Sequence, residues 1–244
     1  RRSSDLNYMK KTLLSLVMLT VISTPVLAKT PIANLKINGD IKPPTCTING
    51  ATQSDVIFDL GKISPSLIPK SSNYIYPHNT TSTNVTIECD ANTYLTFKAT
   101  DTYVNSQLDL DQTSKTKASG IFHLVNKDQV DTSVGGILFV WYNVTVDGKP
   151  AFISRANDAT VGFSDNKTVI VKEVTNGWTT KQQENVDKNS LDLMPGQIFS
   201  TSISAGKASS AFILSKDSLN KKGIDISNGL DFIGEAVLTF NFGV

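Results

Sequence analysis

The sequence predicts an all-β protein organised as a β-sandwich, and three observations carry this prediction. Apolar and polar side chains alternate with a period of two in many short runs, which are rich in Val, Ile, Thr and Phe. Turn signals such as Asn49-Gly50 and Asp147-Gly148 separate these runs. No long stretch has the 3.6-residue period of an amphipathic helix. Many short strands joined by turns are typical of a sandwich.

The individual strands follow from the same alternation. It is clearest in residues 85–89, 94–99 and 235–242. Further candidate strands are residues 56–60, 120–125, 137–146, 151–153, 168–174, 197–203 and 211–214. Asp147-Gly148 predicts a hairpin, and Asn176-Gly177 and Pro195-Gly196 predict turns. We find no internal repeat and no Pro/Ser-rich linker, so we expect a single β-domain at residues 45–244.

An export signal precedes this domain. Met9 is followed by Lys10 and Lys11, then by a nearly continuous apolar run over residues 12–22. Val26 and Ala28 supply the small residues of a cleavage site, so residues 1–28 are predicted to comprise a secretory signal peptide and eight upstream residues. The apolar run is short for a membrane span; an N-terminal anchor or a buried helix is the alternative. We therefore expect an exported protein.

Cys46 and Cys89 are the two cysteines of the chain, and both follow the predicted signal. Two thiols in an oxidising compartment usually pair, so the sequence predicts a Cys46–Cys89 disulfide. A metal site or a reactive thiol is the alternative, but the spacing of the cysteines and of the two histidines fits no common metal-ligand pattern. We expect no metal ion and no cofactor.

The segment between the signal and the first cysteine, residues 29–44, carries an apolar stripe. Ala33, Leu35, Ile37, Gly39 and Ile41 share one face of an extended strand, and polar or charged side chains occupy the other face until Pro43-Pro44. Such a stripe must be buried somewhere. It is either the first strand of the chain's own sandwich or a donor strand that completes the sheet of another subunit.

These features together resemble the chaperone–usher fimbrial subunits, or pilins. The resemblance rests on LKINGDI at residues 35–41 before PPTC at 43–46, on the second cysteine within TNVTIECD at 83–90, and on the alternating GEAVLTFNF at 234–242. The length of the chain and the position of Phe242, one place earlier than the usual penultimate aromatic residue, indicate a divergent fimbrial-like member.

The resemblance implies an immunoglobulin-like fold that lacks its final strand. In that family a partner fills the resulting groove, first a periplasmic chaperone and then the N-terminal extension of the next subunit at the outer-membrane usher. Here the donor strand would comprise Ala33, Leu35, Ile37, Gly39 and Ile41, with Gly39 at a shallow part of the groove. Ala236, Leu238, Phe240 and Phe242 would line the acceptor side. The expected location is the cell surface, and the expected partners are neighbouring subunits, with a host glycan or receptor as a further candidate.

Other functions find less support in the sequence. The chain has 23 basic and 22 acidic side chains, a balance that gives no electrostatic footprint for nucleic acid. It contains no G-x-S-x-G, P-loop or H-E-x-x-H motif, so we do not expect an enzyme. His123 is expected to be an ordinary strand residue. Trp141, Tyr142 and Trp178 keep one alternative open, a monomeric secreted sandwich that binds carbohydrate, although such residues are more often part of a core.

Overall fold

The structure is a computed structural model that describes residues 33–76, 81–108, 110, 118–159, 167–205 and 211–243. The predicted signal peptide lies outside the described residues. The chain divides into two units, residues 1–41 and residues 42–244. In the first unit, the described residues 33–41 form no helix or strand, and the side chains of Leu35, Ile37 and Ile41 are 96%, 97% and 103% exposed.

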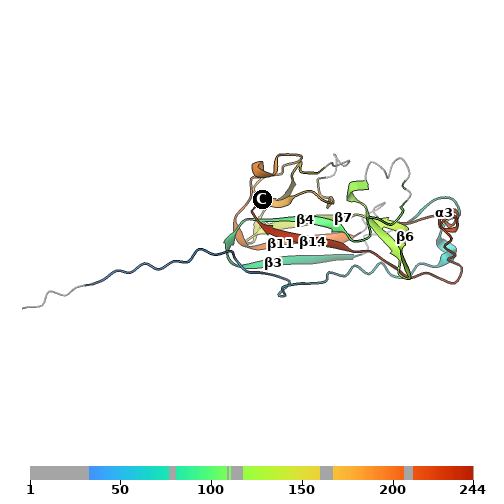
Figure 1. Cartoon of the computed structure of the whole chain (residues 1–244), viewed down its shortest axis with the longest axis horizontal. Coiled ribbons are helices and arrows are strands. Elements are labelled where there is room, and N and C mark those ends of the chain that lie inside the picture. The colour runs from blue at the N-terminus through green and yellow to red at the C-terminus, as the bar shows by residue number, and fades with distance from the viewer. Residues whose placement is uncertain are drawn as a thin grey trace, which may run out of the picture. The chain divides into compact units, whose positions relative to one another are not determined.

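The second unit is mostly β-structure, as predicted, and its described strands form three antiparallel sheets (Figure 1). The first sheet has the order β1 (Cys46–Ile48), β3 (Thr81–Thr93), β11 (Gly196–Ala205), β7 (Phe139–Val146) and β8 (Lys149–Pro150). The second has the order β14 (Ala236–Phe242), β4 (Leu95–Asp101), β10 (Asn176–Thr179) and β9 (Phe152–Arg155). The third has the order β13 (Phe232–Ile233), β5 (Phe122–Asn126), β6 (Gln129–Ile137), β12 (Ala211–Ile213) and β2 (Tyr74–Ile75).

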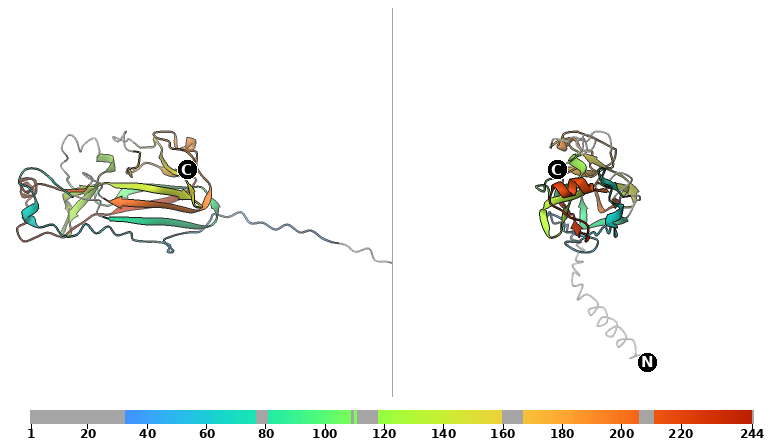
Figure 2. Two further views of the ribbon diagram at one scale, coloured as in Figure 1. Left: turned by 180° about the vertical axis from the view of Figure 1, so that it is seen from behind. Right: turned by 90° about the vertical axis from the view of Figure 1, so that its right-hand side faces the viewer.

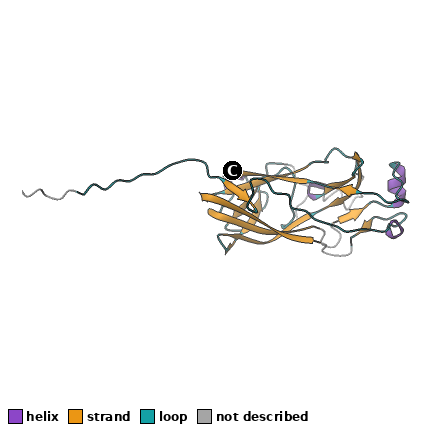
Figure 3. Cartoon of the chain, turned by 90° about the horizontal axis from the view of Figure 1, so that it is seen from below, coloured by secondary structure: helices purple, strands orange, loops and turns teal. Residues whose placement is uncertain are grey.

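Helical structure is sparse among the described residues. One short α-helix, α3 (Lys216–Lys221), begins after Ser215, whose hydroxyl accepts a hydrogen bond from the Ser218 N–H. Three 3-10 turns lie at Pro65–Leu67, Ala118–Gly120 and Lys188–Ser190. Figures 2 and 3 show that α3 and the turn at Pro65–Leu67 lie at one end of the second unit, beyond the long strands.

An aromatic cluster joins the first and second sheets. Trp178 on β10 lies 5.6 Å from both Phe97 on β4 and Phe199 on β11, measured between ring centroids. Phe240 on β14 lies 5.8 Å from Phe97, and Trp141 on β7 lies 6.4 Å from it. These rings come from both sheets and are mostly buried, so the two sheets pack face to face around them.

Most of the predicted strands are present with boundaries shifted by a few residues, and the Asp147-Gly148 hairpin is confirmed. Its two central residues have φ values of 50° and 73°, which a type I′ turn requires at both positions. The long run at 137–146 is divided, because Ile137 belongs to β6 and Phe139 begins β7.

Two predicted strands are wrong. Residues 56–60 alternate in burial as expected but pair with no described strand. Residues 168–174 form only isolated bridges, Val169 with Val140 on β7 and Lys172 with Ala99 on β4. The latter segment crosses from one sheet to the other, so it buries side chains on both faces without forming a ladder.

The predicted turn at Asn176-Gly177 is also wrong, because both residues lie in the buried strand β10. A Cβ atom on Gly177 would lie 2.6 Å from the Leu193 Cδ2 atom. This glycine therefore permits close packing within a sheet, which is the other common use of glycine in a β-protein.

Candidate functional site: an apolar groove

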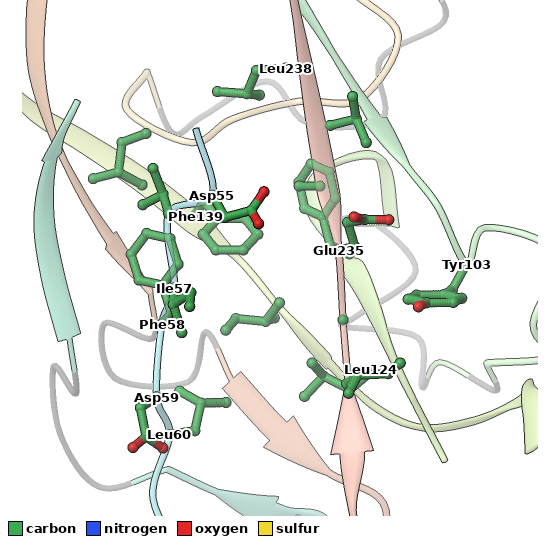
Figure 4. A pocket seen from close by; sticks show the side chains of 18 of the residues that line it. Asp55, Ile57, Phe58, Asp59, Leu60, Tyr103, Leu124, Phe139, Glu235 and Leu238 are labelled. Carbon is green, nitrogen blue, oxygen red and sulfur yellow. The ribbon is translucent and has the colours of Figure 1, made fainter. Parts of the chain in front are cut away.

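A groove of about 1540 Å³ runs along the free edge of β14 (Figure 4). This volume exceeds the ~300–1,000 Å³ that is usual for small-molecule sites. One wall consists of β14 and of residues 229–235 before it; the other consists of β1 and of residues 54–63, which we call the strap. The floor is made of apolar side chains from the other strands, including Val85, Ile87, Leu95, Phe122, Leu124 and Ile203.

The β14 wall carries the four side chains that the sequence assigned to the acceptor strand. Ala236, Leu238 and Phe240 are half-buried and pack against the core, whereas Phe242 is 48% exposed; all four line the groove. β14 pairs with β4 along one edge and is the last strand of its sheet. Its other edge meets no described strand, so backbone N–H and C=O groups there remain available for a further strand.

The strap forms the facing wall. Val56, Phe58, Leu60 and Ile63 are half-buried against the core, and Ile57 between them is 82% exposed. The Phe58 ring lies 5.2 Å from the Phe139 ring, which anchors the strap to β7. Sequence reasoning identified residues 56–60 as extended but not as a wall of this groove. The alternation of their side chains was the available signal. It indicates an extended segment, but it does not show whether that segment pairs with another strand.

The predicted disulfide is confirmed, and it lies at the β1 part of the groove wall. Cys46 and Cys89 are opposite one another in the antiparallel register of β1 and β3. The Asp90 N–H donates to the Thr45 carbonyl and the Thr45 N–H donates to Asp90 Oδ1 at the same place. Cys46 lines the groove, so the crosslink holds a short wall strand on the body of the sheet.

The predicted donor residues have a different setting. Among the described residues of the first unit, Leu35, Ile37 and Ile41 are almost fully exposed, and no Cβ contact within 4 Å would arise at Gly39. These residues are not part of a strand in the chain's own sheets. An apolar stripe of this kind stabilises a structure only when it is buried against another apolar surface.

The aromatic residues that could form a sugar platform are mostly inside the protein. Trp141 and Trp178 are 3% and 1% exposed and belong to the aromatic cluster, while Tyr142 is 41% exposed. A stacking platform needs ring faces that a ligand can reach. The two tryptophans therefore act as core residues.

A network of polar side chains lies beside the groove at Tyr103. Asp101 Oδ2 accepts a hydrogen bond from the His123 backbone N–H at 3.0 Å and lies 3.5 Å from the Lys172 ammonium. His123 Nδ1 lies 3.0 Å from the Tyr103 carbonyl oxygen and 2.8 Å from Ser106 Oγ. Sequence reasoning treated His123 as an ordinary strand residue and missed this network, because its members come from segments far apart in the chain.

This setting gives the protein an expected sensitivity to mild acid. Burial lowers the pKa of His123 below its ordinary value, and nearby Lys172 lowers it further, although Asp101 opposes the shift. The unfolded chain therefore binds a proton at His123 more readily than the folded chain. The folded state therefore keeps its full stability above the pKa of unfolded His123, about 6.5. The free energy of unfolding decreases as the pH falls from there toward the pKa of His123 in the folded chain.

We expect the His123→Asn variant to reduce this dependence. Asparagine keeps a polar group near Nδ1 but does not titrate. The measurement is the free energy of unfolding in urea at several pH values. As the pH is lowered from 7.5 to 5.5, this free energy should fall for the parent chain and stay more nearly constant for the variant. An equal slope in both would show that His123 does not cause the dependence.

Two other kinds of site were sought in the part of the chain that the structure describes. No group of three or more His, Cys, Asp or Glu side chains there could hold a metal ion. No described helix has the length and apolar character needed to cross a membrane. Comparison of the sequence with protein-family models and with curated proteins yields no match.

Proposed function

We propose that the protein is a structural subunit of a bacterial surface fimbria, assembled by donor-strand complementation and exchange through the chaperone–usher pathway, and that it supports adhesion. Residues 33–41 of one copy would enter the groove of the next. The observation that carries the proposal is the presence in one chain of an exposed apolar stripe and an open apolar groove beside an edge strand. A strand in that groove would extend the sheet and cover the floor.

The strand order supports an immunoglobulin-like sandwich as the framework. Such folds place strands A, B, E and D in one sheet and C, F and G in the other. In chain order, β1, β3, β4, β7, β11 and β14 would be strands A to F, because the first sheet runs β1-β3-β11-β7 and β14 lies beside β4. The position of strand G, beside β14, would then be the groove. The other described strands and α3 would be insertions in this framework.

Export supports the same proposal. The predicted signal peptide would deliver the chain to the periplasm, where the Cys46–Cys89 disulfide can form. A periplasmic chaperone would occupy the groove until an outer-membrane usher brings the next subunit. The buried positions of Trp141 and Trp178 leave the carbohydrate-binding alternative without its platform.

Filling the groove from within tests the proposal. Ala236 lines the groove and Asn241, on the same strand, does not. We expect Ala236→Trp to weaken assembly at least tenfold, because a large side chain would occupy the space of the incoming strand. Asn241→Trp, the matched control, should assemble as the parent chain does. Size-exclusion chromatography with light scattering on the purified full chain measures the concentration at which oligomers form.

Unfolding in urea checks that each variant is folded, and Ala236→Met offers a milder change if tryptophan is not tolerated. Folded Ala236 variants that assemble as well as the parent chain would contradict the proposal.

A further inference from the structure

We propose that acidic side chains on the two rims of the groove select the register of the incoming strand through Lys36 of a second copy. This inference rests on the proposed function. It adds what decides how the incoming strand is aligned in the groove and how it is recognised. The preferred occupant is then residues 33–41 of a second copy, whose one basic side chain, Lys36, has a defined place in the groove.

The rims of the groove have an excess of negative charge. Among the described residues, the charged ones that line it are Asp55, Asp59, Asp231, Glu235, Lys62 and Lys127. Figure 4 shows Asp55 and Asp59 on the strap and Glu235 on the facing wall, next to β14, so both walls contribute carboxylates. Glu235 is held in place by the Thr102 hydroxyl, which donates to its Oε2 atom at 2.6 Å. The floor below is apolar, and it weakens the screening of these charges by water.

The incoming segment presents its charge opposite these rims. In an extended strand Leu35 and Ile37 would point to the floor, and Lys36 between them would point outward at the level of the rims. Its neighbours on the outward face, Asn34 and Asn38, are uncharged. Lys36 is therefore the side chain of this stretch that can meet the carboxylates of both walls.

Apolar contacts alone select the register only weakly. The stripe repeats every two residues, so a slip by two residues returns an apolar face to the floor. The charges on the outward face do not repeat in this way. A slip by four residues places Asp40 where Lys36 had been, and a carboxylate then faces the carboxylates of the rims. Charge thus disfavours a register that burial of the stripe alone would still allow.

Binding of a fluorescent peptide to the purified full chain tests this inference. The probe is a labelled peptide of residues 33–41, in which Lys36 is the one basic side chain, and its Lys36→Glu version is the comparison. At ~50 mM salt we expect the Lys36→Glu peptide to bind about tenfold more weakly, and the two affinities to converge near ~1 M salt. An acceptor chain with Asp55→Lys and Asp59→Lys should reverse the preference and bind the Lys36→Glu peptide better.

The control acceptor carries Asp128→Lys and Asp131→Lys, which change the net charge equally. These residues are exposed on the β5–β6 hairpin and do not line the groove. The control should keep the parent preference for Lys36. Equal binding of both peptides at low salt, or no reversal in the Asp55→Lys/Asp59→Lys chain, would overturn the role of the rims. Failure of the parent peptide to bind at any salt concentration would instead overturn the proposed function.

Discussion

Replacing both Leu35 and Ile37 with serine is expected to abolish assembly and to leave the free energy of unfolding unchanged. The two side chains are 96% and 97% exposed, so the folded chain loses no packing when they are shortened. In an assembled state each would be buried in the groove, which contributes about 2 kcal/mol for a side chain of this size. Together their loss should weaken association about a thousandfold. Light scattering on the full chain and unfolding in urea measure the two effects separately.

Asn34→Ser with Asn38→Ser is the matched control. These substitutions lie on the same segment but on its other face, and they add no charge. Assembly should then stay close to that of the parent chain. The prediction fails if the Leu35 and Ile37 variant still assembles, or if it unfolds more easily than the parent, since the latter would mean that the stripe is buried within its own molecule.

Removing the disulfide should have the largest effect on stability. In the chain-entropy treatment, a crosslink between cysteines 43 positions apart contributes about 4 kcal/mol. Small domains are typically stable by only about 5–15 kcal/mol, so Cys46→Ser with Cys89→Ser should lower the urea midpoint sharply. β1 has only three residues and, among the described strands, pairs with β3 alone, so it also depends on this crosslink to stay on the sheet.

The oxidised parent chain treated with a reductant should approach the serine variant in stability, and untreated parent protein should contain no titratable thiol. A loss below about 1 kcal/mol in the serine variant would show that the bridge constrains the unfolded chain little. Because Cys46 lines the groove, the same variant should also bind the peptide of residues 33–41 more weakly.

An open groove has a physical cost that explains why the proposed pathway would need a chaperone. The second edge of β14 meets no described strand and lies beside an apolar floor, and such edges pair readily with other chains. An occupant that supplies both hydrogen bonds and apolar side chains removes this exposure. The exposed stripe at residues 33–41 and the groove are thus two parts of one expected interaction.

The sequence by itself determined the β-class, the alternation that gives β14 its half-buried face, and the pairing of Cys46 with Cys89. Each of these follows from residues close together in the chain, or from a simple count of two thiols in a chain that is predicted to be exported. Alternation encodes which side chains of a strand share a face, since that depends only on the backbone period.

Only the tertiary structure decided which extended segments form strands and where the groove lies. Residues 56–60 alternate like a strand but form the strap, because they pair with no described strand. Apart from Ile137, strand β6 was not among the predicted strands. A Cβ on its Gly135 would lie 2.1 Å from the Phe212 carbonyl oxygen, so glycine there permits a close approach of β12. His123, Asp101 and Lys172 meet across three segments. The pairing of strands and the close approach of their backbones depend on residues that are distant in the chain, and local sequence patterns do not reveal those residues.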